Sequence, residues 1–338
     1  MHAFPRRTHL CAALLALGLG SAHAAPQMVV VGYGGAGQKA QDEAIFKPFS
    51  AKDGSQLIQS EYNGEMARIQ VMADTGNVDW DVVQIEGPDL MRGCDEGIYE
   101  HLDWQRLGHA AELIPDAAQD CGSAALVWSV AIAYDRNKLA QAPASWADFW
   151  DVSKYPGKRG LRKRAVYNLE FALLADGVKV EDVYTVLATP QGVDRAFAKL
   201  SALKPYIQWW EAGAQPAQWL AAGDVVMTST YSGRIAAAAQ AGSPLAVVWP
   251  GSLYGMDYWA IIKGSRHAEQ AKRLIAYTNQ PAAQVRYVQQ IPYGPTNTEA
   301  AAQLDPALAK WVPTAPQNLA GALSMNVEFW VDHGDELE

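Results

Sequence analysis

QMVVVGYGGAG, residues 27–37, is the clearest structural signal in this chain. Its first five residues form a short apolar run typical of a buried strand, and the glycines that follow lead into a helix expected over residues 38–49. Alternating strands and helices continue downstream and predict an α/β fold, with a largely parallel sheet and helices on both faces. Further strands are expected at 56–59, 80–85, 127–134, 206–210, 225–228, 245–249 and 258–262, and helices at 65–73, 145–150, 169–175, 193–200, 265–279 and 281–290.

The first 24 residues predict a secretory signal peptide. Arg6 and Arg7 give a cationic start, and residues 10–19 form an apolar run too short to span a bilayer as a helix. Ala22-His23-Ala24 then supplies the small-x-small site that a signal peptidase cuts. The mature chain is therefore expected to work in the periplasm, which excludes most nucleotide-dependent chemistry.

The composition is that of an acidic globular protein. Hydrophobic residues make up 49% and charged residues 19% of the chain, so wholesale disorder is excluded. After residue 24 no apolar stretch approaches the length of a spanning helix, so the product is expected to be soluble. The formal net charge is −9, and loss of Arg6 and Arg7 makes it −11, so nucleic acid and anionic lipid are poor partners. The remaining chain is long enough for two lobes.

Gly32, Gly34 and Gly37 match the dinucleotide-binding pattern G-x-G-x-x-G. The acidic residue expected about 20 positions later would be Asp53, but Asp53 lies in an expected turn and not at a strand end. Together with the export signal, this argues against NAD. Two interpretations stay open: a tight strand–helix turn, or a turn whose backbone N–H groups bind a ligand carboxylate.

The chain contains no G-x-S-x-G, H-E-x-x-H or Walker A sequence, which favours binding over catalysis. His101, His109, His267 and His333 are scattered, so neither a metal nor a cofactor is expected. Signal cleavage would leave only Cys94 and Cys121, which most simply form one disulfide. It would stabilise the fold by about 3 kcal/mol. Two buried thiols are the alternative.

Aromatic residues with a polar group dominate, with 12 Trp and 14 Tyr against 7 Phe. In α/β sheets ligands bind where strands end, and aromatic walls suit both an ammonium group and a methylene chain. Ordinary core packing is the alternative for any single ring. The aromatic residues near expected strand ends or turns are Tyr33, Trp209, Trp210, Tyr231, Tyr254, Tyr258, Trp259 and Tyr293.

Nine stretches, spread over nearly the whole mature chain, carry a family resemblance through their order and number. They are GG at 34–35, WDVV at 80–83, GCDEG at 93–97, SWADFW at 145–150, YPGKR at 155–159, FALLADG at 171–177, YSGR at 231–234, MDYWAI at 256–261 and IPYGPTN at 291–297. In these stretches the chain resembles periplasmic solute-binding proteins of ABC importers, in the spermidine/putrescine-binding group.

The resemblance implies the two-lobe periplasmic binding protein fold of type II: mixed, mostly parallel sheets flanked by helices, a hinge crossed by short strands, and a central cleft. Lobe one would hold residues 26–134 plus 250–302, and lobe two residues 135–249 plus 303–338. Asp257 falls on the position where polyamine binders place an amine-anchoring carboxylate, and Tyr293 matches a cleft aromatic.

LRKRAVY at 161–167 departs from the polyamine pattern, because it has three basic residues where those binders carry acids. These residues are expected to face solvent; the alternative is a cation in the cleft that opposes a second ligand amine. Arg234 precedes Asp257 by 23 positions. That pair resembles relatives that bind γ-aminobutyrate and similar ω-amino acids, with arginine on the carboxylate and aspartate on the amine. An interlobe salt bridge is the alternative role for Arg234.

The resulting prediction is a monomeric periplasmic receptor, not an enzyme, that captures γ-aminobutyrate or a related ω-amino acid by hinge closure. It would deliver the ligand to a cognate ABC permease in the inner membrane. A polyamine receptor, a sensor and an exported hydrolase are the alternatives. Asp257, with Glu86, would hold the ammonium, Arg234 the carboxylate, and Gly34 and Gly35 would offer N–H groups. The expected walls are Tyr33, Trp210, Tyr231, Tyr254 and Tyr293.

Overall fold

The computed structural model describes residues 1–2 and 27–338, so the predicted signal peptide lies almost entirely outside the described residues. The described strands form one mixed sheet in the order β2-β1-β3-β8-β4-β7-β5-β6, with β9 beside β8. Their bounds are β1 Gln27–Gly32, β2 Gln56–Glu61, β3 Val82–Glu86, β4 Gly122–Asp135, β5 Arg159–Arg162, β6 Ile207–Trp210, β7 Met227–Tyr231, β8 Leu245–Ile261 and β9 Leu323–Ser324.

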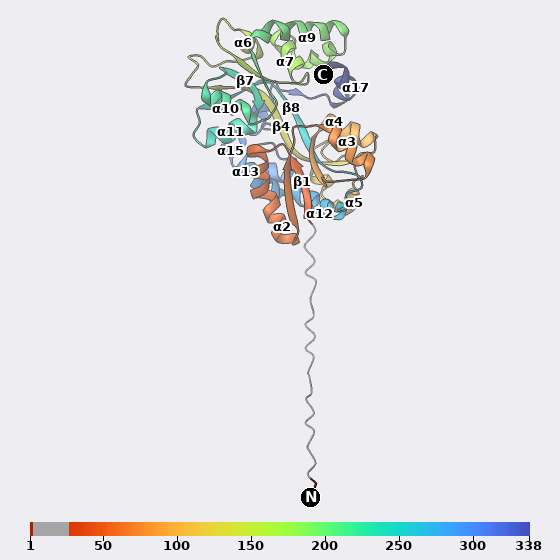
Figure 1. Cartoon of the computed structure of the whole chain (residues 1–338). Coiled ribbons are helices and arrows are strands. Elements are labelled where there is room, and N and C mark those ends of the chain that lie inside the picture. Colours follow the sequence, from red (N-terminus) through yellow and green to blue (C-terminus); the bar gives the residue numbers. More distant parts are fainter. Residues whose placement is uncertain (3–26) are drawn as a thin grey trace.

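Helices cover both faces of this sheet (Figure 1), and none of those described is long and apolar enough to cross a membrane. A π-helical turn, Asp42–Phe46, joins α1 to α2. Short 3-10 turns occupy Ala110–Glu112, Val180–Asp182 and Lys204–Tyr206. The helices are α1 Gly35–Gln41, α2 Lys47–Asp53, α3 Met66–Thr75, α4 Gly87–Asp95, α5 Trp104–Leu107, α6 Trp146–Trp150, α7 Asn168–Ala175, α8 Val183–Leu187, α9 Pro190–Leu203, α10 Gln215–Ala222, α11 Ser232–Gln240, α12 Ala268–Thr278, α13 Pro281–Gln290, α14 Thr298–Ala302, α15 Pro306–Ala309, α16 Pro316–Leu319 and α17 Val327–Leu337.

Two long antiparallel strands, β4 and β8, organise the sheet. Strand β3 pairs with residues 257–261 of β8, and β7 pairs with residues 130–134 of β4. Because β4 and β8 are antiparallel, these two segments lie at opposite ends of the strand pair. The strands β1 and β2 therefore extend the sheet at one end and β5 and β6 extend it at the other. Figure 1 shows α2, α5 and α12 near the first end and α6, α7, α9, α10 and α11 near the second. The lobe boundaries given above stay a prediction.

The expectation of short connecting strands was wrong for β8, which runs through the two strands expected at 245–249 and 258–262. Pro250 and Gly251 lie between the two expected strands. In the structure they lie in an irregular segment, because the register steps from Val130–Leu253 directly to Ile132–Val248. Such a bulge accommodates a proline, which has no N–H to donate to the ladder.

Cys94, near the end of α4, is joined to Cys121, just before β4, by a disulfide. The predicted pairing is therefore confirmed. Cys121 is completely buried and packs in a core group that includes Val31, Trp80 and Tyr258. The bond thus ties α4 to the start of a central strand.

The C-terminal helix α17 contacts elements from both ends of the sheet. Arg92 of α4 forms an ion pair of 2.8 Å with Asp335. At the other end, the Trp330 indole N–H donates to Glu170 Oε1 on α7 at 2.7 Å. Glu338 accepts from Arg164 Nε at 3.0 Å. Residues 327–338 therefore contact elements at both ends of the sheet.

Glu170 is fully buried, and Tyr184 also donates to its Oε1 atom, whereas its Oε2 atom has no partner among the described residues. Burial raises the pKa of Glu170 to about 7, because it outweighs the two donors that stabilise the carboxylate. The folded protein therefore holds this proton to a higher pH than the unfolded chain does. Between the two pKa values, the free energy of unfolding falls as the pH rises.

We predict that Glu170→Gln removes this pH dependence. From about pH 5 to about pH 8 the wild type should lose up to roughly 3 kcal/mol of unfolding free energy through Glu170, and the variant should not. Urea denaturation of both proteins at the two pH values measures the effect. A stability difference between them that is the same at both pH values would contradict the prediction.

Candidate functional site

The turn between β1 and α1 forms one wall of the site, and it requires glycine. Gly34 and Gly35 both have left-handed backbone angles, with φ of 63° and 61°. A Cβ atom on Gly34 would collide with the Glu61 carboxylate, and one on Gly35 would lie 2.5 Å from Arg234 Nη1. Gly35 therefore allows the backbone to approach the arginine, and Gly34 allows it to approach Glu61. The Gly34 N–H, expected to serve a ligand, already donates to Gln38 Oε1 at 3.0 Å.

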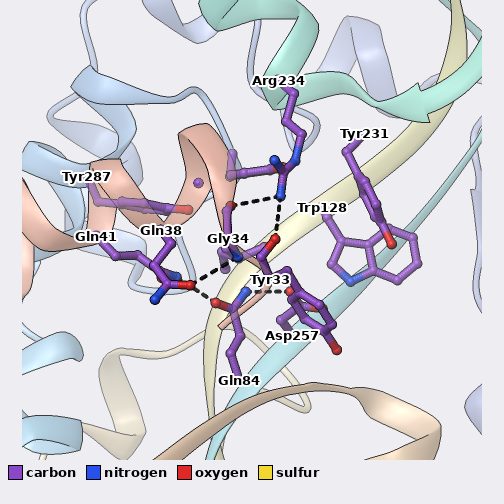
Figure 2. Close-up of a pocket in the computed structure, with 13 residues that line it drawn as sticks. Tyr33, Gly34, Gln38, Gln41, Gln84, Trp128, Tyr231, Arg234, Asp257 and Tyr287 are labelled. Atoms are coloured by element: carbon purple, nitrogen blue, oxygen red, sulfur yellow. Dashed lines mark hydrogen bonds between the residues drawn. The ribbon is translucent and has the colours of Figure 1, made fainter. Parts of the chain in front are cut away.

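Arg234, in the first turn of α11, reaches that glycine turn from the other side (Figure 2). Its side chain is buried, and Nη2 donates to the carbonyl oxygens of Tyr33 at 3.3 Å and Gly34 at 3.2 Å. The Nε donor has no acceptor within the described chain. A buried guanidinium with an unused donor is suited to an incoming carboxylate, which binds such a group through two parallel hydrogen bonds.

Asp257, on β8, supplies a buried carboxylate to the same site. A chain of amides orients it: Gln41 Nε2 donates to Gln84 Oε1 at 2.7 Å, and Gln84 Nε2 donates to Asp257 Oδ2 at 2.6 Å. Burial, followed by the nearby negative charge of Glu86, raises the pKa of Asp257 well above its ordinary value. Within the described chain, Asp257 forms no ion pair, so a cationic group would be stabilised here.

Two neighbouring cavities share Tyr33 and Arg234. The inner one has a volume of about 30 Å³ and the outer one about 160 Å³. The inner cavity is large enough to hold water but far smaller than the roughly 300–1,000 Å³ of ordinary ligand sites, so a larger ligand requires Arg234 or the surrounding rings to move. The inner cavity is lined by Tyr33, Gly34, Gly37, Gln38, Gln41, Gln84, Leu126, Trp128, Tyr231, Arg234, Asp257, Tyr287 and Tyr293, and the outer one by Tyr33, Gly35, Glu61, Tyr62, Asn63, Ala212, Gly213, Ala214 and Arg234.

Most of the expected site residues come together, but not all. Gly35 lines only the outer cavity, and Tyr254 lines neither. Glu86 and Trp210 lie next to Tyr231, outside both linings. The expected residues in the inner cavity are Tyr33, Gly34, Tyr231, Arg234, Asp257 and Tyr293.

Arg162 contradicts the expectation that the basic run 161–167 faces solvent. It is 5% exposed, and its Nη1 atom donates to Glu86 Oε1 at 2.9 Å. Glu86 therefore already has a cationic partner. The Arg162 and Arg164 charges hold the pKa of Glu86 below its ordinary value, although burial alone would raise it. Lys163 does face solvent and pairs with the exposed Glu211.

Sequence reasoning missed the amides and two of the aromatic rings of the site. Gln84 gave a detectable signal, because it is a polar residue inside the buried strand expected at 80–85. Gln38 and Gln41 gave none, since polar residues on a helix are normally exposed. Trp128 and Tyr287 belong to a strand and a helix that packing alone explains.

The described residues bring together one group with metal-ligand atoms, namely Cys94, His101 and Cys121. The two sulfurs are bonded to each other, so they offer no thiolate to a metal. His101 lies beside them, with Nδ1 3.7 Å from Cys121 Sγ. These three residues line neither of the two cavities.

Comparison with known proteins identifies the family of this chain. Bacterial extracellular solute-binding proteins match the chain over residues 44–319. The chain belongs to this family. Its members bind solutes outside the cytoplasm and are not enzymes.

Three relatives are informative. The chain is 55% identical to a γ-aminobutyric acid-binding protein of Pseudomonas aeruginosa, over 98% of this chain and 95% of the relative. It is 27% identical to the spermidine/putrescine-binding periplasmic protein of Escherichia coli K12, over 89% and 86%. A solved structure described as a GABA receptor superposes with a TM-score of 0.82 at 30% identity, over 92% of this chain and 95% of that one. The predicted family resemblance and the solute-binding fold are thereby confirmed.

We predict that Gly35→Ala destabilises the protein by more than backbone strain alone. A left-handed alanine costs about 1–2 kcal/mol, and the new methyl group would also displace Arg234. Gly54→Ala is the matched control, because Gly54 has φ of 74° but no atom within 4 Å of a Cβ. Urea denaturation should show the larger loss for Gly35→Ala, and no excess loss once Arg234 is also replaced by alanine. Equal losses in the wild-type background would contradict the clash.

Proposed function

We propose that this protein is a periplasmic receptor for γ-aminobutyrate or a closely related linear ω-amino acid. The observation that carries the proposal is that Arg234 and Asp257 line one buried cavity. One is a guanidinium with an unused donor, and the other is a buried carboxylate with no cationic partner in the described chain. A ligand with a carboxylate at one end and an ammonium at the other satisfies both groups. The 55% identity to a γ-aminobutyric acid-binding protein supports this ligand.

The ligand would act by holding the two ends of the sheet together. Arg234 is on α11, whereas its carbonyl partners belong to the turn after β1. A ligand carboxylate would form an ion pair with the Arg234 guanidinium, while the ligand ammonium would bind Asp257 on β8. Tyr33, Tyr231 and Tyr293 would contact the methylene groups. Because these contacts exist together only in the closed arrangement, ligand binding selects that arrangement.

The protein's setting follows from the same proposal. Residues 1–24 would direct export and be removed, and the mature protein would act as a monomer. It would pass its ligand to an ABC permease in the inner membrane, with nucleic acid playing no part. A polyamine is the second candidate ligand, supported by the more distant spermidine/putrescine-binding relative. The ion pair between Glu86 and Arg162 favours the ω-amino acid, because it leaves Asp257 as the carboxylate available to a ligand amine.

Calorimetric titration of the mature protein with γ-aminobutyrate and, separately, with putrescine tests the ligand. We expect γ-aminobutyrate to bind, and Arg234→Ala and Asp257→Asn each to weaken binding by at least about 30-fold, since each removes one partner of a buried charge pair. Lys163→Ala, which removes an exposed cation, is the control and should bind normally. Putrescine binding without any response to γ-aminobutyrate would overturn the ω-amino acid assignment.

Binding should also release a proton from Asp257. Its pKa is raised in the free protein, and a bound ammonium would lower it. The complex therefore holds fewer protons than the free protein, so affinity should rise with pH until the raised pKa is passed. Titrations in two buffers of different ionisation enthalpy measure the proton directly. A binding enthalpy that is the same in both buffers would show that Asp257 is already ionised before the ligand arrives.

A further inference from the structure

The guanidinium of Arg162 is surrounded by aromatic rings. It lies 5.2 Å from the ring centroid of Tyr167, 5.9 Å from that of Trp210 and 6.0 Å from that of Tyr231. The Glu86 carboxylate contacts the same guanidinium at 2.9 Å. We call these four residues around Arg162 the cation cage. Rings of this kind around a positive charge are how proteins bind cationic ligands, and here the cation is a side chain of the protein itself.

Hydrogen bonds fix the cation in the cage. Arg162 Nη1 donates to Glu86 Oε1 at 2.9 Å, to the Tyr167 hydroxyl at 2.9 Å and to the Tyr231 hydroxyl at 3.0 Å. Both charged side chains are 6% exposed. Removing two charges from water is costly, and a buried ion pair is often no more stable than apolar residues of the same size. The stability of the fold alone does not account for this pair.

The backbone at Tyr167 is strained in the conformation that completes the cage. Tyr167 is a buried aromatic residue with φ of 75°, a region that bulky side chains rarely adopt. The adjacent Asn168 holds the segment by donating to the carbonyl oxygens of Arg162 and Arg164, both at 2.6 Å. Strain of this kind persists where the surroundings impose it, and it is characteristic of binding sites.

The cage adjoins the ligand cavity. Tyr231 belongs to both, since it lines the inner cavity and its hydroxyl also donates to Glu86 Oε1 at 3.2 Å. Glu86 on β3 is directly opposite Asp257 on β8 in the strand register. The protein thus places two buried carboxylates side by side, one neutralised by Arg162 and one available to a ligand.

We propose that the cation cage is a second cation-binding site that Arg162 occupies permanently, and that this occupation restricts the receptor to ligands with a single amine. The inference deepens the function proposed above. With Arg162 in place, a diamine would bring its second ammonium against a guanidinium. Without it, Glu86 and the three rings would accept that ammonium, and a diamine could bridge Asp257 and Glu86.

The test is calorimetric titration of Arg162→Ala with putrescine. We expect the variant to bind putrescine at least about tenfold more tightly than the wild type does. The double variant Arg162→Ala/Glu86→Gln is the matched control, because it has the same emptied cage without the carboxylate, and it should lose the gain. A folded Arg162→Ala that binds putrescine no better than the wild type, or a double variant that keeps the gain, would overturn the proposal.

A second measurement covers the case in which the emptied cage destabilises the protein. Methylguanidinium should raise the melting temperature of Arg162→Ala by filling the cage, and should leave the wild type and the double variant unchanged. No selective rise would count against a cation site. The proposed function is tested separately, because a wild type that fails to bind γ-aminobutyrate would refute that function while the putrescine gain could still be measured.

Discussion

The carboxylate of Asp257 lies away from water on a central strand, with Glu86 directly opposite it in the ladder. Two neighbouring buried carboxylates cannot both carry a charge without compensation. The structure resolves this unevenly. Glu86 receives a permanent guanidinium, whereas Asp257 receives only a glutamine amide. Asp257 is therefore the carboxylate that a positively charged ligand group would stabilise, and the residues around it determine where that group can bind.

Parts of the chain that are far apart in the sequence contribute side chains to this site. The ends of β3 and β5, the turn after β1 and the first turn of α11 all converge on a single stretch of β8. Each supplies a group whose direction is fixed by its own local structure: glycines with left-handed angles in the turn, an amide chain from α1 to β3, and a strained tyrosine after β5. The surrounding aromatic rings keep these groups largely buried, and electrostatic interactions are stronger in such surroundings than in water.

The sequence predicted those helices and strands well whose residue pattern lies within a few neighbouring positions. Helix α13 spans the residues expected from the sequence, and the first strand leads into its glycine turn as predicted. Arg234 and Asp257 were expected near each other and line one cavity. Arg162 was misplaced because all four residues of β5 are buried, so alternation along so short a strand carries no information on which side chain faces a partner. Its partner, Glu86, is 76 residues away.

Strands β4 and β8 each run from one end of the sheet to the other, and their pairing has a mechanical consequence. Two hydrogen-bonded strands form a ribbon that twists and bends readily but strongly resists sliding or stretching along its length. We therefore expect relative motion of the two ends to be mainly rotation. A docked transporter would contact two surfaces, one at each end of the sheet. The angle between these surfaces would differ for bound ligands of different length.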